Sequence, residues 1–176
     1  MSLNQADRSD RIEFEALRLS GRLQYDADFD NLIRWISDRQ ACGDDYPLEW
    51  RVLVAEDDVA NRLVLGSLLE KSGLQVITVE NGRQALEALE REAVDLVLLD
   101  INMPEMNGLD TARAIRDLPG DRADLPVIAI TSDVSPMRVN EMREAGFDIC
   151  LEKPVRRDAL FQIIVNSLSG RVAKVA

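Results

Sequence analysis

The sequence of 176 residues contains no histidine and only two cysteines, Cys42 and Cys150. The cysteines stand in unrelated contexts, and the sequence has no CxxC motif and no Cys/His spacing. Structural zinc and catalysis by a histidine are therefore not expected. Because two cysteines make no disulfide framework, we expect a reducing, cytoplasmic location.

Long apolar runs and a basic surface are missing as well. No apolar stretch reaches the ~18 residues of a membrane span, and the polar start MSLNQADRSD does not resemble a signal peptide. The net charge is -11, which argues against binding to duplex DNA or to an anionic membrane, because both need a basic face. We therefore expect no nucleic acid and no membrane among the partners.

The acidity is spread along the chain and does not form an acidic tail. The first 50 residues carry 11 acids and 6 bases, a charge of -5, and the remainder carries 21 acids and 15 bases, a charge of -6. With 46% hydrophobic and 30% charged residues, the composition is that of a globular protein. A chain of this length can form one full core with an appendage.

The N-terminal part, residues 1–50, is predicted to be a separate extension. Phe29, Leu32, Ile33 and Ile36 are spaced at i, i+3, i+4 and i+7, which is typical of one face of a helix. We expect residues 11–40 to be mainly helical. Residues 40–50 are rich in turn formers and are expected to be a linker.

From Arg51 onward the pattern becomes regular, with five apolar strands that alternate with five amphipathic helices. Strict alternation of this kind predicts an α/β protein with a parallel sheet and helices on both faces. The length fits a doubly wound five-stranded parallel sheet of order 2-1-3-4-5, not an eight-fold barrel. We expect this domain to span residues 51–168 and residues 169–176 to be a frayed tail. The predicted strands are 51–55, 75–79, 94–99, 126–130 and 148–151, and the predicted helices 59–72, 83–92, 108–118, 136–145 and 156–168.

The stretch VDLVLLDINMPEMNG, residues 94–108, organises this domain. Its apolar run suits a strand that is buried on both faces, and the run stops at Asp100. Turn-forming residues follow, including Pro104 and Gly108. Asp100 is therefore expected at the carboxyl end of the central strand, which is the edge where open α/β sheets bind their ligands.

Polar residues follow four of the predicted strands and should meet at this same edge. Three carboxylates in one place repel each other unless a cation lies among them, and oxygen ligands of this kind suit Mg²⁺. With the metal and an ammonium group nearby, Asp100 could act as a carboxylate nucleophile and form an aspartyl phosphate. The residues concerned are Glu56 and Asp57 after the first strand, Asp100 after the third, Thr131 after the fourth and Lys153 after the fifth.

Four stretches in this order, VLVAEDDVANR, LVLLDINMPEMNG, PVIAITSD and LEKPV, resemble the receiver domain of two-component response regulators. The details of DVANR and of Asn81-Gly82, which we read as a turn, are more similar to receivers attached to hybrid histidine kinases. The resemblance implies a flavodoxin-like (CheY-like) fold and a Mg²⁺-dependent or Mn²⁺-dependent phosphoacceptor that catalyses only its own phosphorylation and dephosphorylation. It implies the following roles: metal ligands Glu56, Asp57, Asp100 and the backbone carbonyl of Asn102; phosphoacceptor Asp100; switch hydroxyl Thr131; and lysine Lys153.

The sequence departs from the family at Cys150. Many receivers carry an aromatic residue at this place, three positions before the lysine, and its ring turns inward on phosphorylation. A thiol cannot fill that volume, so the resemblance leaves the output mechanism open. The implied partners are a histidine kinase or a His-containing phosphotransfer protein, a downstream protein on the face formed by residues 132–168, and a second copy in a homodimer.

Two other functions compete with that of a phosphoacceptor. A receiver-like module could dock a partner without phosphorylation, although the complete set of acids, Thr131 and Lys153 argues against it. A phosphatase with an aspartate nucleophile would need a second aspartate two residues later as general acid. Asn102 stands at that place, and its amide cannot perform this role.

Overall fold

The computed structural model describes residues 50–172. The predicted N-terminal helix, the predicted linker up to residue 49 and the end of the predicted tail lie outside the described residues. The strands are β1 (Arg51–Ala55), β2 (Gln75–Val79), β3 (Leu96–Asp100), β4 (Val127–Thr131) and β5 (Ile149–Glu152). The helices are α3 (Val59–Glu70), α4 (Gly82–Arg91), α5 (Gly108–Arg116), α6 (Pro136–Ala145) and α7 (Arg157–Val172), together with the 3-10 helix η1 (Gly120–Asp124).

The five strands form one parallel sheet in the order β2-β1-β3-β4-β5. The predicted fold class and strand order are thereby confirmed. Strand β3 lies in the centre, and all five of its residues are buried. This explains its unbroken apolar run, since a central parallel strand is covered on both faces.

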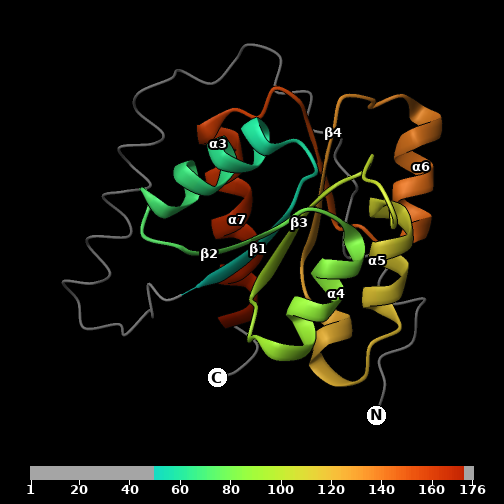
Figure 1. Cartoon of the computed structure of the whole chain (residues 1–176), viewed down its shortest axis with the longest axis horizontal. Helices are drawn as coiled ribbons and strands as arrows, with labels where there is room; N and C mark the ends of the chain where they lie inside the picture. Colours follow the sequence, from blue (N-terminus) through green and yellow to red (C-terminus); the bar gives the residue numbers. More distant parts are fainter. Residues whose placement is uncertain (1–49, 173–176) are drawn as a thin grey trace.

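Helices cover both faces of the sheet, with α3 and α7 on one side and α4, α5 and α6 on the other (Figure 1). Alternate residues of each strand point to opposite faces, and two cores result. In β3, Leu96 and Leu98 pack with α3 and α7, whereas Val97 and Leu99 pack with α4, α5 and α6. The predicted site residues lie at the carboxyl ends of the strands.

Several element boundaries differ from those predicted. Asp100 and Thr131 are the last residues of β3 and β4, not the first residues beyond them. Helix α7 continues to Val172, four residues past the predicted end at Leu168. The segment after α5 forms η1, which the pattern did not predict. The one-residue differences at the strand ends are of the size by which assigned element boundaries ordinarily vary.

The Asn81-Gly82 pair is not a turn. Asn81 is the N-cap of α4, with its side chain accepting a hydrogen bond from the backbone N–H of Gln84 at 2.9 Å. Gly82 is the first residue of that helix. Asparagine and glycine occur both in tight turns and at helix starts, so the pair alone does not distinguish a turn from a helix start.

Trp50 belongs with the sheet, although the predicted boundary left it in the extension. Its side chain packs against the core on the α3 and α7 side. Its backbone carbonyl accepts a hydrogen bond from Gln75 N–H at 3.0 Å, which continues the β1–β2 pairing by one step. A truncated form of this domain should therefore begin before Trp50.

Candidate functional site

Three carboxylates meet at the carboxyl edge of the sheet. Glu56 follows β1 directly, Asp57 is next to it, and Asp100 ends β3. One oxygen from each carboxylate lies within 4.8 Å of the others. Glu56 and Asp100 are buried, whereas Asp57 is exposed. The predicted acid cluster is therefore present, and it opens to solvent on the Asp57 side.

Lys153 reaches this cluster from the end of the edge strand β5. Its Nζ atom donates to Glu56 Oε2 at 2.8 Å and lies 3.1 Å from Asp100 Oδ2. The residue follows β5 and is separated from Glu56 by 97 positions in the sequence. One ammonium group thus bridges the two buried carboxylates.

The charges of these groups are strongly interdependent. Burial raises the pKa of Glu56 above its ordinary value; the negative charge of Asp100 raises it further, while the hydrogen bond from Lys153 opposes the shift. Burial alone would lower the pKa of Lys153, but its hydrogen bond to Glu56 and the charge of Asp100 outweigh burial and raise it. The lysine stays protonated, and the acids still carry excess negative charge that a cation would relieve.

Thr131 lies at the same edge, at the end of β4, and is buried. Its Oγ1 atom accepts a hydrogen bond from the backbone N–H of Asp133 at 3.1 Å. Asp133 in turn accepts one from the N–H of Ser135 at 2.9 Å. The hydroxyl is therefore tied to the loop that leads into α6.

Asn102 lies on the β3–α5 loop, two residues after Asp100, and its side chain is exposed. The loop turns sharply: Met106 N–H donates to Pro104 C=O at 2.7 Å, and Glu105 between them has a φ of 63°. An i to i+2 hydrogen bond around a residue with positive φ makes a γ-turn, a rare and strained conformation. The loop thereby folds back so that Gly108 N–H reaches Ile101 C=O at 3.0 Å.

Arg62 of α3 is a supporting residue that the sequence reading did not single out. Its guanidinium donates to the backbone carbonyls of Glu56 and Asp57, at 2.7 and 3.1 Å, and pairs with Glu80 at 2.8 Å. It therefore fixes the backbone that carries two of the three acids. The signal was available, because Arg62 lies one turn into the helix that follows the acids, in the stretch EDDVANR.

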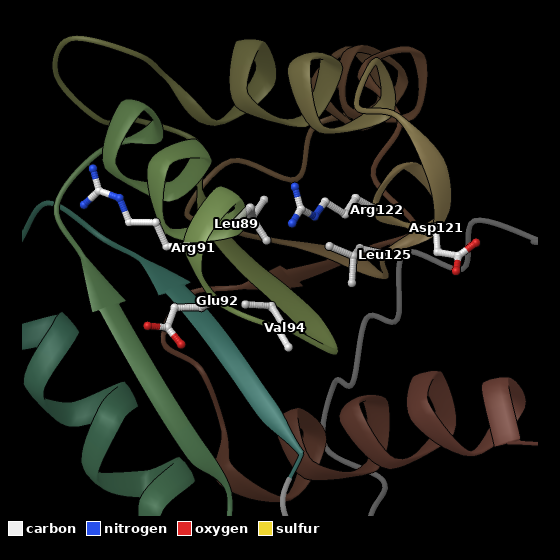
Figure 2. Close-up of a pocket in the computed structure, with 8 residues that line it drawn as sticks. Leu89, Arg91, Glu92, Val94, Asp121, Arg122 and Leu125 are labelled. Carbon is white, nitrogen blue, oxygen red and sulfur yellow. The ribbon is translucent and has the colours of Figure 1, made fainter.

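A cavity of about 330 Å³ lies at the opposite edge of the sheet, between the end of α4, the start of β3 and η1 (Figure 2). Its floor is formed by Leu89, Val94 and Leu125, and the Arg122 side chain points toward Leu89. None of the three acids or Lys153 lines it. This cavity is thus separate from the charged cluster.

The comparison of the sequence with known protein families agrees with this geometry. The family model of the response regulator receiver domain matches residues 52–165. The chain belongs to the response regulator receiver family. Receivers of this family are signalling phosphoacceptors in phosphorelays and not enzymes that act on other substrates, and the acidic cluster Glu56, Asp57 and Asp100 is typical of them.

Individual relatives include sensor proteins and a receiver with bound metal. The chain is 37% identical over 118 residues to the sensor protein GacS of Pseudomonas syringae pv. syringae, covering 66% of this chain and 13% of GacS. It is 41% identical over 117 residues to the sensory/regulatory protein RpfC of Xanthomonas campestris pv. campestris, covering 66% of this chain and 16% of RpfC. The chain therefore spans under about one fifth of either relative.

A solved structure of similar fold is the receiver domain of the sensor histidine kinase PA1611 from Pseudomonas aeruginosa PAO1, which has a magnesium ion in its active-site cleft. The TM-score is 0.65 at 28% identity, covering 69% of this chain and 98% of that one. In the part of this chain that the structure describes, no helix has the length and apolarity needed to cross a membrane.

The raised pKa of Glu56 predicts an unusual pH dependence of stability. The folded protein holds this proton more tightly than the unfolded chain does, so stability is lost as the pH rises from the ordinary glutamate value of 4.5 through the raised one. Glu56→Gln should lack this step. In a chelating buffer, the melting temperature of the variant should therefore gain on that of the wild type between about pH 4 and pH 8.

Other carboxylates titrate in both proteins, so only the difference between the two melting curves reports Glu56. The pKa of Lys153 lies above its ordinary 10.5, so its charge does not change in this window. A difference that stays constant across the pH range would show that Glu56 carries no such cost.

Proposed function

We propose that this chain accepts a phosphoryl group on Asp100 from a phosphohistidine donor, with Mg²⁺ or Mn²⁺ as cofactor, and that the modification changes which partner it binds. One observation carries the proposal: Lys153 Nζ lies 2.8 Å from Glu56 and 3.1 Å from Asp100, beside Asp57. This arrangement places a nucleophilic carboxylate, a cation for phosphoryl oxygens and a set of metal ligands within one cluster.

The proposed transfer is a direct displacement at phosphorus. A carboxylate oxygen of Asp100 attacks the phosphorus atom of the phosphohistidine, and the P–N bond breaks as the P–O bond forms. The electron pair of the broken bond stays on the imidazole nitrogen, which takes a proton from solvent. Lys153 would neutralise part of the charge on the phosphoryl oxygens, and the Thr131 hydroxyl would donate to one of them in the product.

The donor set of the cluster fits a divalent cation. The residues that would hold it are Glu56, Asp57, Asp100 and the backbone carbonyl of Asn102, all oxygen ligands of the kind that Mg²⁺ prefers. The bound ion would neutralise charge on the phosphoryl group during transfer. The raised pKa of Glu56, caused by burial and by the charge of Asp100, supports this proposal because a cation would relieve both effects.

Asp57→Ala should weaken Mg²⁺ binding by at least about tenfold, or 1.4 kcal/mol, because it removes one ligand. A metal titration by calorimetry without phosphate measures this. Asp58→Ala is the matched control: Asp58 is the next acid along the chain, and its carboxylate caps α3 by accepting from Asn61 N–H at 2.8 Å. Equal Mg²⁺ affinity in wild type and Asp57→Ala would remove Asp57 from the site.

The partners we propose follow from the missing histidine and from the relatives. Because the chain has no histidine, the donor must be another domain or protein: a histidine kinase or a His-containing phosphotransfer protein in a reducing cytoplasm. GacS and RpfC, which match over this domain, carry sensor names. A downstream protein or a second copy of the chain would read the face formed by residues 132–168.

Phosphotransfer chemistry tests the proposal against its alternatives. The protein is incubated with a small-molecule acyl phosphate and Mg²⁺, and the intact mass and released phosphate are followed. A stoichiometric gain of phosphoryl mass that hydroxylamine removes, as expected for an acyl phosphate, supports the phosphoacceptor. No gain in mass would favour the docking module, and sustained release of phosphate from unrelated phosphomonoesters would favour the phosphatase.

A further inference from the structure

Arg138 connects α6 to the loop that carries Asn102. It lies in the first turn of α6, next to Val139, which anchors that helix in the core. Its guanidinium donates through one nitrogen to Asn102 Oδ1 at 3.3 Å and through the other to Glu141 Oε2 at 2.7 Å. The side chain therefore connects two residues that are 36 positions apart in the sequence, and it donates hydrogen bonds both to a loop and to its own helix.

The same cation acts on a second loop. Asp133 lies two residues after Thr131, as Asn102 lies two residues after Asp100. The backbone N–H of Ser135 lowers the pKa of the Asp133 carboxyl, and the positive charge of Arg138 lowers it further. One guanidinium thus interacts with two of the loops that leave the proposed phosphorylation site, the loop after β3 and the loop after β4.

The start of α6 has no side-chain cap. Ser135 occupies its N-cap position, but its side chain makes no capping hydrogen bond. At Cys150 the chain also lacks the ring that turns inward in many receivers. Besides the path from Thr131 through Asp133 and Ser135, Arg138 offers a second connection, because it lies between the loop that follows Asp100 and this helix.

We propose that Arg138 is a positioning residue that transmits the charge on Asp100 to α6. On phosphorylation its guanidinium gives up the ion pair with Glu141 and moves toward the phosphorylated β3–α5 loop. This inference rests on the proposed phosphorylation of Asp100. A phosphoryl group adds negative charge and acceptor oxygens beside Asn102. The added charge attracts the guanidinium, which loosens the pair with Glu141 and draws the first turn of α6 toward the site. A partner on the 132–168 face would sense that movement.

If Glu141 and the phosphoryl group compete for the Arg138 guanidinium, substitutions of Arg138 and of Glu141 should change the affinity for a phosphoryl analogue in opposite directions. Arg138→Ala should weaken binding of the beryllium trifluoride anion, a phosphoryl analogue, by about threefold at saturating Mg²⁺, the range of a partly exposed ion pair. Glu141→Gln should strengthen it by a similar factor, because it frees the guanidinium. Mg²⁺ alone should bind Arg138→Ala at least as tightly as wild type, since removing a neighbouring cation cannot repel a metal ion.

The experiment measures both affinities by titration in the full chain, and follows amide hydrogen exchange over residues 137–141 with and without the analogue. Wild type and Glu141→Gln should show a change in exchange on binding, and Arg138→Ala should lose it. Damage to the fold would instead weaken both ligands together. Arg138→Ala with wild-type analogue affinity, or Glu141→Gln without any gain, would overturn the inference.

The proposed function and this inference fail in different ways. If wild type does not bind the analogue, or if Asp100→Asn binds it equally well, the phosphoacceptor assignment itself is wrong. If wild type binds it through Asp100 and the Arg138 variant behaves identically in affinity and exchange, only the role of Arg138 is refuted. Arg138→Lys adds a further distinction, because lysine keeps the charge but cannot present the planar fork to two acceptors at once.

Discussion

Asp100→Asn is expected to abolish phosphoryl uptake, with a rate at least about a hundredfold below wild type, because no other residue replaces a lost nucleophile at this position. The amide has nearly the same shape as the carboxylate, and its oxygen can still accept a hydrogen bond from Lys153. The substitution also removes the repulsion between Asp100 and Glu56. The variant should therefore fold at least as well as wild type, and any loss of uptake reports chemistry.

The measurement is intact mass after incubation with an acyl phosphate donor and Mg²⁺. Asp121→Asn serves as the matched control. Asp121 lies on η1 and lines the cavity at the opposite edge of the sheet from the acid cluster. It should gain the phosphoryl group at the wild-type rate. If Asp100→Asn still gains it stoichiometrically, another carboxylate of the cluster is the acceptor and the proposed role of Asp100 is wrong.

Much of the site could be predicted from the sequence because it depends on strand topology and not on side-chain detail. An apolar run that ends in Asp100 predicts a buried strand with an acid at its carboxyl end. Once the order 2-1-3-4-5 is inferred, Lys153 is expected at the same edge of the sheet as Glu56, even though 97 positions separate them; the contact itself also needs the lysine side chain to reach past the ends of β4 and β3. Parallel strands bring their ends to one edge whatever the lengths of the connections.

Contacts that depend on the path of a loop or the reach of a long side chain could not be predicted in this way. The bond between Arg138 and Asn102 needs the γ-turn at Glu105 and one rotamer of a flexible arginine. Asn81-Gly82 satisfies the residue preferences of a turn and of a helix start equally well. In both cases the deciding information lies in the backbone around the residue, which the local sequence does not contain.

Gly108→Ala is expected to destabilise the protein by about 3 kcal/mol, at the upper end of what overpacking usually costs. A Cβ atom at this position would overlap the backbone carbonyl oxygen of Asp100 and lie 2.9 Å from the Cα of Ile101. Both neighbours are backbone atoms at the end of the central strand, so no side-chain rotation can relieve the contact. The β3–α5 loop or Asp100 itself must move.

The same substitution at Gly66 provides the control because the chemical change is identical and the surroundings differ. There a Cβ atom would meet only the Thr78 Cγ2 atom at 3.5 Å, an ordinary van der Waals contact, within the helix α3. Alanine is the better helix former, so Gly66→Ala should stabilise the protein by up to about 1 kcal/mol. Urea unfolding of the two variants should therefore shift the midpoint in opposite directions from wild type.

A second consequence links Gly108 to the chemistry. Because the clash falls on the carbonyl of Asp100, relief of the overlap would displace the residue that we propose as the nucleophile. Small displacements of a reacting group lower rates steeply. Gly108→Ala should therefore slow phosphoryl uptake even under conditions where it is fully folded, whereas Gly66→Ala should not. If Gly108→Ala matched Gly66→Ala in both stability and uptake, the loop could adjust freely, and the close approach of Gly108 to β3 would have no part in holding Asp100 in place.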